Sequence, residues 1–200
     1  ETLDHAAALA KEFNVGVHTH IAEGQIDSDA ADRLQDTTQD NWILAHGVHL
    51  QNEHGLKGAI IHNPRSNMNN SVGYAAPKRF DNPVGLGTDG IGADMIEEFR
   101  LGYARLREDD ITAPPTDIWK MLETNIALFP ECQEDIVTWS YPKMDSWHLA
   151  FSTGVKPTDI VIAGKVIMKE GVLMTVDAEE IRSKASEAST RLFKRIDDQS

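Results

Sequence analysis

Two histidines and a glutamate lie close together in the stretch VHTHIAEG, residues 17–24. His18 and His20 are two residues apart, the spacing that places side chains on one face of a β-strand, and Glu23 follows three residues later. Imidazole nitrogens and carboxylate oxygens are common ligands of catalytic metal ions, and a carboxylate beside such a site can transfer protons. The stretch therefore indicates metal-assisted acid–base chemistry at the end of a strand, with His20 nearer that end.

Three further apolar runs end in polar or ionisable residues: WILAH (42–46), GAIIHN (58–63) and PVGLGTD (83–89). If these runs are parallel strands, their carboxyl ends meet at one edge, where barrels and open α/β sheets alike form their sites. We therefore expect His20, His46 and Asp89 to lie near one another, with Glu23 in the adjoining loop. We interpret Gly85, Gly87 and Gly90 as room for backbone near a metal, because their spacing matches no phosphate-binding motif.

The elements that would position these residues alternate between strand and helix. Helical spacing of apolar residues predicts helices over 3–13, 93–107 and 116–129, the last with Thr116 as its N-cap. Strand followed by helix, repeated, predicts a parallel sheet of the α/β class. Only about a dozen residues separate His46 from the strand at Gly58, which predicts either minimal helices or missing residues.

The last part of the chain has a different rhythm. TDIVIAGKVIMKEG (158–171) predicts a hairpin that turns around Ala163–Gly164–Lys165. Asp177 and Glu180 form a capping-box pattern that begins a final helix. The apolar stripe of this helix consists of Ile181, Ala185, Ala188, Leu192 and Ile196. We expect a boundary between residues 130 and 157.

Composition narrows the classes of partner. The 200 residues include 19 Lys and Arg against 32 Asp and Glu, which gives a net charge of -13 and a pI near 4.9. Such a charge repels phosphate backbones and anionic lipids, so neither nucleic acid nor membrane is an expected partner. One cysteine, Cys132, excludes an intrachain disulfide framework and favours a cytoplasmic setting. The opening ETLDHAAALAKEF has no initiator methionine and resembles the later part of a longer protein.

A family resemblance rests on four motifs in order: HTHIAEG, WILAHGVHL, HNPRSNMNNSVGY and GLGTDGIGADM. Together they resemble the second half of the catalytic barrel of the amidohydrolase superfamily, in its aminohydrolase and chlorohydrolase branch. RSNMNNSVGY and LGTDGIGADMIEEFR are most similar to SsnA-type aminohydrolases. The resemblance implies the later half of a TIM-like (β/α)8 barrel in residues 1–130, a connecting region in 131–157, and the β-hairpin of a smaller composite domain plus a C-terminal helix in 158–200.

The resemblance also implies roles for single residues. His20 and Asp89 would bind one divalent metal ion, zinc or iron. Asp89 would also accept the proton of the hydrolytic water, and His46 would orient that water or polarise the substrate. Glu23 would carry a proton to the leaving group.

Arg65 and Asn67 would lie where substrate binds. The implied reaction is hydrolytic deamination of a small nitrogen heterocycle or an amidine-like C–N bond. Dechlorination on the same site is the alternative within the family, and family resemblance also suggests a homodimer. An acidic residue placed to protonate nitrogen favours deamination, because chloride needs no proton to depart.

The chain departs from the family in one respect. The H-x-H pair that ends the first strand of such barrels and supplies two more ligands is absent, since His18 to His20 is the one H-x-H in the sequence. We expect the first four strands to lie upstream of residue 1, so that this chain holds about half a metal site. The alternative from another class is a catalytically inactive barrel fragment or an assembly subunit.

Overall fold

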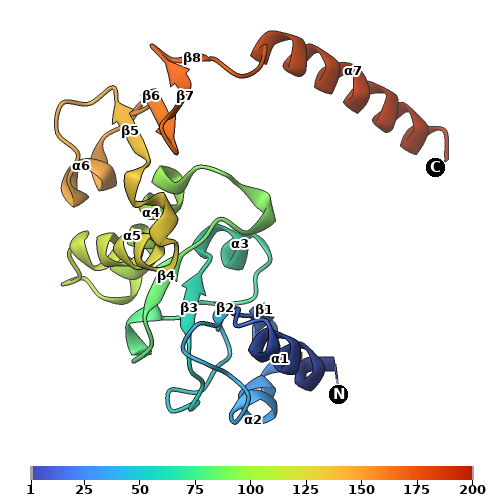
Figure 1. Ribbon diagram of the computed structural model, residues 1–200, viewed down its shortest axis with the longest axis vertical. Helices are drawn as coiled ribbons and strands as arrows, with labels where there is room; N and C mark the ends of the chain where they lie inside the picture. Colours follow the sequence, from blue (N-terminus) through green and yellow to red (C-terminus); the bar gives the residue numbers. More distant parts are fainter. Residues whose placement is uncertain (1, 200) are drawn as a thin grey trace. The chain divides into compact units, whose positions relative to one another are not determined.

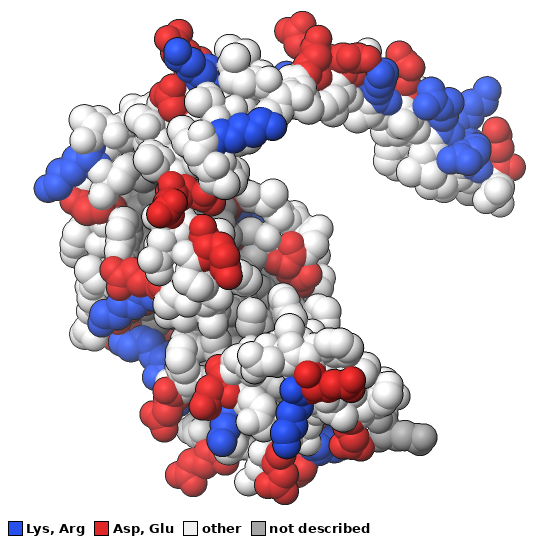
Figure 2. Space-filling view, in the orientation of Figure 1, with Lys and Arg blue, Asp and Glu red and all other residues white. Residues whose placement is uncertain are grey.

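The structure, a computed structural model, describes residues 2–199 (Figure 1). The chain divides into two compact units: unit 1 comprises the residues up to 130 together with 145–152, and unit 2 comprises 131–144 and the residues from 153 onward. Acidic and basic side chains are interspersed over the face shown in Figure 2.

Unit 1 contains a parallel sheet, as the sequence predicts. Its strands, in sheet order, are β1 (His18–Ile21), β2 (Ile43–His46), β3 (Ala59–His62) and β4 (Val84–Leu86). The register pairs His20 with Ala45, and all three neighbouring pairs run parallel. The carboxyl ends of the four strands therefore lie along one edge.

The helices of unit 1 are α1 (Thr2–Glu12), α2 (Ala30–Leu34), α3 (Pro64–Asn69), α4 (Met95–Asp109), α5 (Thr116–Leu128) and α6 (Ser146–Phe151). Short 3-10 turns are η1 (Gln25–Asp27), η2 (Pro77–Arg79) and η3 (Asp89–Ile91), and unit 2 begins within η4 (Pro130–Glu134). α4 begins after Asp94, whose carboxylate accepts hydrogen bonds from the backbone N–H groups of Ile96 and Glu97. The predicted N-cap at Thr116 is wrong: Pro115 occupies that position, where its fixed φ of -58° suits the start of a helix.

One face of the sheet supplies the core of unit 1. Leu44 and Ile60 are fully buried and pack in a cluster with Trp42, Leu56 and other apolar side chains. Burying an aliphatic or aromatic side chain of this size stabilises a fold by about 1.5–3 kcal/mol. Because side chains alternate along a strand, the neighbouring residues on β2 and β3 point to the opposite face.

The connection from β2 to β3, residues 47–58, contains turns but no helix. The minimal helix that sequence spacing allowed is therefore wrong for this connection. The chain closes it at Gly58, whose φ is +96° and whose position has no room for a Cβ, because one would lie 2.5 Å from the backbone oxygen of Trp42. The next residue, Ala59, donates its N–H to that same oxygen at 2.9 Å.

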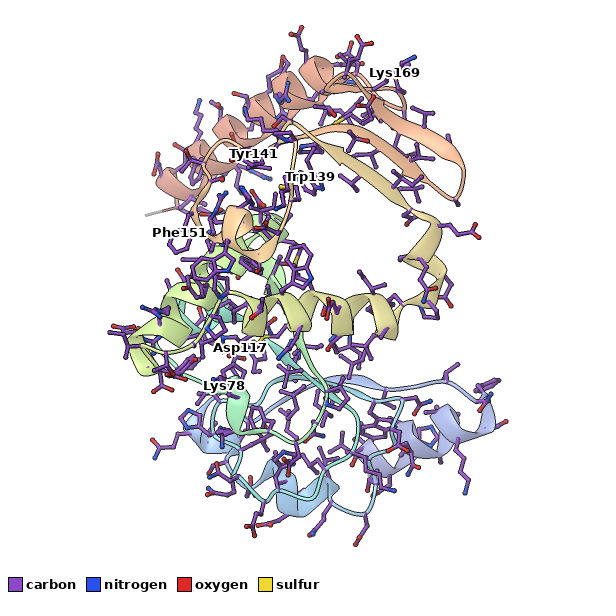
Figure 3. The ribbon with its side chains drawn as sticks, turned by 90° about the vertical axis from the view of Figure 1, so that its left-hand side faces the viewer. Lys78, Asp117, Trp139, Tyr141, Phe151 and Lys169 are labelled. Atoms are coloured by element: carbon purple, nitrogen blue, oxygen red, sulfur yellow. The ribbon has the colours of Figure 1, made fainter. Side chains whose placement is uncertain are left out.

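Lys78 braces η2 against the two long helices of unit 1. Its ammonium group lies 3.1 Å from a carboxylate oxygen of Asp110, just after α4, and 3.2 Å from one of Asp117 in α5. Figure 3 labels Lys78 and Asp117, which extend toward one another from their elements. These two contacts raise the pKa of Lys78.

Unit 2 contains an antiparallel sheet and one long helix. The strands are β5 (Ile136–Trp139), β6 (Pro157–Ile162), β7 (Lys165–Lys169) and β8 (Val172–Leu173), in that order in the sheet. β6 and β7 form the predicted hairpin, and its turn residues Ala163 and Gly164 both have positive φ angles, of 48° and 76°. β5 lies in the segment interpreted from sequence as a connection.

The final helix, α7 (Ala178–Asp197), begins at the predicted cap. The carboxylate of Asp177 accepts hydrogen bonds from the N–H groups of Glu179 and Glu180. The side chain of Glu180 pairs with Lys184. Figure 2 shows acidic side chains toward the start of this helix and basic ones toward its end, an arrangement that the helix dipole favours.

Among the described residues no helix is long and apolar enough to cross a membrane.

Candidate active site

The residues predicted at the metal and proton positions come from three of the four strand ends in unit 1. His20 and His46 lie at or next to the ends of β1 and β2, Asp89 opens η3 just after β4, and Glu23 lies in the loop after β1. A pocket of about 500 Å³ opens beside them, and its lining includes Ala45 and Ile61 on the sheet face opposite the core. His20, His46 and Asp89 also line this pocket. The parallel topology thus gathers residues that are far apart in the sequence.

Glu23, His46 and Asp89 converge closely. Each offers one ligand atom, and the three atoms lie within 4.8 Å of one another. His46 Nε2 is 3.7 Å from Glu23 Oε2 and 3.6 Å from Asp89 Oδ2, and the imidazole is fully buried while the two carboxylates are partly open to solvent. These separations are too long for hydrogen bonds, and Nε2 has no hydrogen-bond partner among the described residues. A buried nitrogen that faces two carboxylate oxygens across such a gap suits a shared cation or proton.

His20 reaches the same place by a different contact. Its ring stacks on that of His46, with centroids 5.4 Å apart and planes inclined by 26°. His20 is not one of the three residues whose ligand atoms meet within 4.8 Å. The geometry therefore brings together all four residues predicted at the metal and proton positions, with His20 at the side of the cluster.

The backbone is strained where these residues leave the strands. Ala22, His46 and Asp89 have φ angles of +45°, +78° and +52°, in the left-handed region that non-glycine residues rarely adopt. Ala22 is held there because its N–H donates to Asp27 Oδ2 at 2.8 Å. Residues in this conformation cost about 1–3 kcal/mol each and cluster at functional sites. The left-handed residues therefore mark the points where the chain changes direction after β1, β2 and β4.

Asp89 receives two hydrogen bonds that favour its ionised form. The hydroxyl of Ser66 donates to Oδ2 at 2.6 Å, and the N–H of Gly90 donates to Oδ1 at 2.5 Å. Together they lower the pKa of Asp89, with the Ser66 bond as the larger cause. Ser66 is fully buried. Sequence reasoning did not select it; its position inside the HNPRSN motif was the available signal.

Asn67 and Arg65, predicted to bind substrate, both have partners inside the protein. Asn67 is buried, and its Oδ1 lies 2.9 Å from His46 Nδ1. Arg65 Nε donates to the buried carboxylate of Glu98 at 2.6 Å, and its Nη2 lies 2.7 Å from Glu97 Oε2. These bonds to Glu98 and Glu97 raise the pKa of Arg65. The contact of Arg65 and Asn67 with substrate stays a prediction.

Two of the glycines near Asp89 make room for amide side chains. A Cβ at Gly87 would lie 2.3 Å from Asn63 Oδ1, and one at Gly85 would lie 2.4 Å from Asn125 Oδ1. Asn125 bonds both backbone groups of Leu86, at 3.0 Å and 2.7 Å. The interpretation of these two glycines as room for backbone is thus replaced by room for side-chain amides.

His62, at the end of β3, is buried without a hydrogen-bond partner for either ring nitrogen among the described residues. Burial, together with the smaller effects of the nearby charges of Arg105 and His46, lowers its pKa from 6.5 to about 4. The ring packs edge-on against Tyr74, with centroids 5.9 Å apart. His62 is therefore neutral in the folded protein at pH 7.

We expect His62 to make the fold sensitive to acid. An unfolded histidine takes up a proton near pH 6.5, whereas the folded one resists protonation down to about pH 4. The contribution of neutral His62 to the free energy of unfolding is therefore fully present above about pH 6.5. It falls by about 3 kcal/mol as the pH drops toward 4. Urea unfolding of the full-length protein between pH 7 and 4 would measure this loss. In His62→Gln the free energy of unfolding should fall less steeply as the pH decreases. An equal slope in the variant would exclude His62 as the source.

Comparison with known proteins places this site in a family. The Amidohydrolase family model matches residues 1–128. The 5-methylthioadenosine/S-adenosylhomocysteine deaminase of Halothermothrix orenii is 29% identical, with 92% of this chain and 53% of the relative covered. The 5'-deoxyadenosine deaminase of Methanococcus maripaludis is 27% identical, with 97% and 56% covered.

Solved structures share the fold. An adenosine deaminase from Xanthomonas campestris with bound zinc superposes with a TM-score of 0.71 at 20% identity, over 96% of this chain and 54% of that one. The atrazine chlorohydrolase TrzN from Arthrobacter aurescens, complexed with zinc, gives 0.71 at 19% identity, over 92% and 51%.

This chain spans about half the length of the curated relatives it matches. The alignment with the H. orenii relative extends over 228 positions, more than the 200 residues here, so that relative carries internal residues that this chain lacks. The match over residues 1–128, together with the site at the strand ends, shows that this chain belongs to the amidohydrolase family.

Proposed function

We propose that the full-length protein is a metal-dependent aminohydrolase that releases ammonia from a small nitrogen heterocycle. The observation that carries the proposal is the convergence of Glu23, His46 and Asp89 within 4.8 Å at the carboxyl ends of parallel strands. Family membership and the deaminase names of the relatives support it. Those names favour adenosine-like nucleosides as the first substrates to test.

In this proposal the sheet of unit 1 is the later half of a (β/α)8 barrel. Four parallel strands in sequential order, with catalytic groups at their carboxyl ends, are the arrangement that such barrels use. Residues 131–157 would connect the barrel to a smaller composite domain, to which residues 158–200 would belong. We also place the protein in the cytoplasm, which the single cysteine supports.

The residues fit a divalent cation. Two carboxylate oxygens and a buried imidazole nitrogen without a hydrogen-bond partner face one another, and zinc accepts both kinds of ligand. Of these groups, Asp89 would hold the ion together with His20, whose ring stacks on that of His46. The family resemblance and the zinc in related structures support this assignment. When bound, zinc or iron would act as a Lewis acid that activates water.

The chain's own residues would divide the proton chemistry. Asp89, kept ionised by Ser66, would accept a proton from the attacking water. His46, whose Nε2 faces the two carboxylates, would orient the water or polarise the substrate. Glu23, partly open to solvent, would deliver the proton to the departing nitrogen. Both carboxylates lie less than 4 Å from one imidazole nitrogen, so the proton would travel a short distance.

Two alternative functions compete with this proposal. Dechlorination could use the same site, and a chlorohydrolase is among the solved structures that share the fold. A non-catalytic protein with a vestigial metal site is the rival from another class. Metal content and leaving group separate all three possibilities.

We expect the purified full-length protein to carry about one zinc or iron per chain and to release ammonia from at least one member of a panel of adenosine nucleosides, purines, pyrimidines and triazines. Elemental analysis and a coupled ammonia assay would measure both quantities. The metal-stripped protein serves as the control and should regain activity when zinc is added. A metal-free, inactive full-length protein would contradict the proposal, and chloride release without ammonia would favour dechlorination.

A further inference from the structure

One short helix contacts two of the site groups through adjacent residues. Ser66 and Asn67 follow one another in α3, and both are buried. Ser66 donates its hydroxyl hydrogen to Asp89 Oδ2 at 2.6 Å, and Asn67 Oδ1 lies 2.9 Å from His46 Nδ1. These contacts span 23 and 21 residues of sequence, so α3 links two strand ends that are remote along the chain.

The contact with His46 decides which ring nitrogen faces the site. A carbonyl oxygen can only accept, so Nδ1 must carry the hydrogen that it donates to Asn67. In the neutral ring, Nε2 then presents a lone pair toward Glu23 and Asp89. Asn63 Nδ2 also lies near Nδ1, but at 3.4 Å it is the more distant neighbour.

α3 is itself held in place from outside the site. Arg65, the residue before Ser66, is bonded through its backbone N–H and its Nε to the fully buried carboxylate of Glu98 in α4, at 3.3 Å and 2.6 Å. The guanidinium also packs against Gly92, where a Cβ would lie 3.1 Å from Nε. A partly buried ion pair therefore holds the helix that carries Ser66 and Asn67.

We propose that α3 is the positioning element of the site, in which Asn67 sets the tautomer of His46 and Ser66 sets the orientation of the Asp89 carboxylate. Both are positioning residues that act through the groups they bond, a role that for Asn67 is an alternative to the substrate contact predicted from the sequence. This inference rests on the proposed function for its kinetic consequences. Its structural statement, the tautomer of His46, can be tested without any activity.

The physical basis is the loss of orientation when a supporting partner is removed. Partners that orient ligands and catalytic side chains commonly contribute 10- to 100-fold to activity or metal affinity. Removing the Asn67 oxygen leaves the buried Nδ1–H unpaired, so the ring would shift its hydrogen to Nε2. That change points a hydrogen where a lone pair was directed.

The experiment compares Asn67→Leu, which removes the acceptor at similar volume, with Asn67→Asp, which keeps an acceptor oxygen, in the full-length protein. Long-range ¹H–¹⁵N spectra of histidine-labelled protein report which nitrogen of His46 carries the hydrogen. We expect the Nδ1–H form in the wild type and in Asn67→Asp, and its loss in Asn67→Leu. Asn69→Leu, an exposed position on the same helix, is the matched control and should leave His46 unchanged. If Asn67→Leu fails to fold, Asn67→Ala takes its place in the same measurement.

Kinetics provide the second reading once a substrate is known. We expect Asn67→Leu and Ser66→Ala to lower kcat about 10- to 100-fold at saturating metal, with little change in KM, and Asn67→Asp to recover part of the loss. A wild-type His46 with its hydrogen on Nε2, or an unchanged tautomer in Asn67→Leu, would overturn the inference. A raised KM with unchanged kcat would also overturn it and would make Asn67 a substrate-binding residue. An inactive wild type with the expected tautomers would refute the proposed function and leave the positioning role intact.

Discussion

Replacing Asp89 by Asn in the full-length protein is expected to cause two separable losses. Metal binding should weaken, because the variant loses a negative charge at the proposed metal position. Turnover should also fall by about 100-fold or more even when added zinc saturates the site, because an amide cannot accept a proton from water. The carboxylate is ionised in the working range, since the Ser66 hydroxyl and the Gly90 N–H lower its pKa.

Zinc titration with turnover measured at each concentration separates the two losses. Asp40→Asn, an exposed acid in the turn before β2, is the matched control and should behave as the wild type. Full recovery of the wild-type rate in excess zinc would leave Asp89 as a metal ligand only. His46, whose Nε2 lies 3.6 Å from Asp89 Oδ2, would then be the nearest group to activate the water.

Glu23→Gln is expected to lower turnover without weakening metal binding. Metal content should stay near the wild-type value, because Glu23 is placed to move a proton, while ammonia release should fall about 100-fold or more. The side chain is partly open to solvent, and its Oε2 lies 3.7 Å from His46 Nε2, so it can exchange protons and still reach the site. Glutamine preserves shape but cannot carry the proton.

The leaving group gives this second variant its sharpest test. Chloride departs without a proton, so any dechlorination by the protein should be much less sensitive to Glu23→Gln than deamination. The exposed Glu53→Gln change on the connection between β2 and β3 is the control for loss of a surface charge. Unchanged ammonia release in Glu23→Gln would remove its proposed role.

The strands and the gathering of the site were predictable because they rest on simple periodicities. Apolar runs that end in His20, His46 and Asp89 predicted parallel strands, and parallel strands place their carboxyl ends at one edge. The hairpin of β6 and β7 and the cap at Asp177 were equally local signals. For the hairpin and the cap, the deciding interaction lies within a few residues of the pattern that predicted it.

The support of the site was not predictable, because it depends on contacts distant in sequence. Nothing near Ser66 indicates that its hydroxyl meets Asp89, and Asn67 resembles an ordinary loop residue until α3 places it against His46. Glu98 is an acid in a helix pattern, where exposure is the usual outcome, yet Arg65 holds it fully buried. Thr116 failed as a cap for a local reason, because the preceding proline already had the geometry of a helix start.

The left-handed backbone at Ala22, His46 and Asp89 limits which substitutions can raise the thermal stability of the protein. A glycine would relieve the conformational strain at each position, but at two of them it would delete the imidazole or the carboxylate that the proposed chemistry needs. Only at Ala22 can the strain be relieved without removing such a group. Selection for thermal tolerance is therefore free to act at the end of β1, whereas at His46 and Asp89 a gain in thermal tolerance would come at the expense of catalysis.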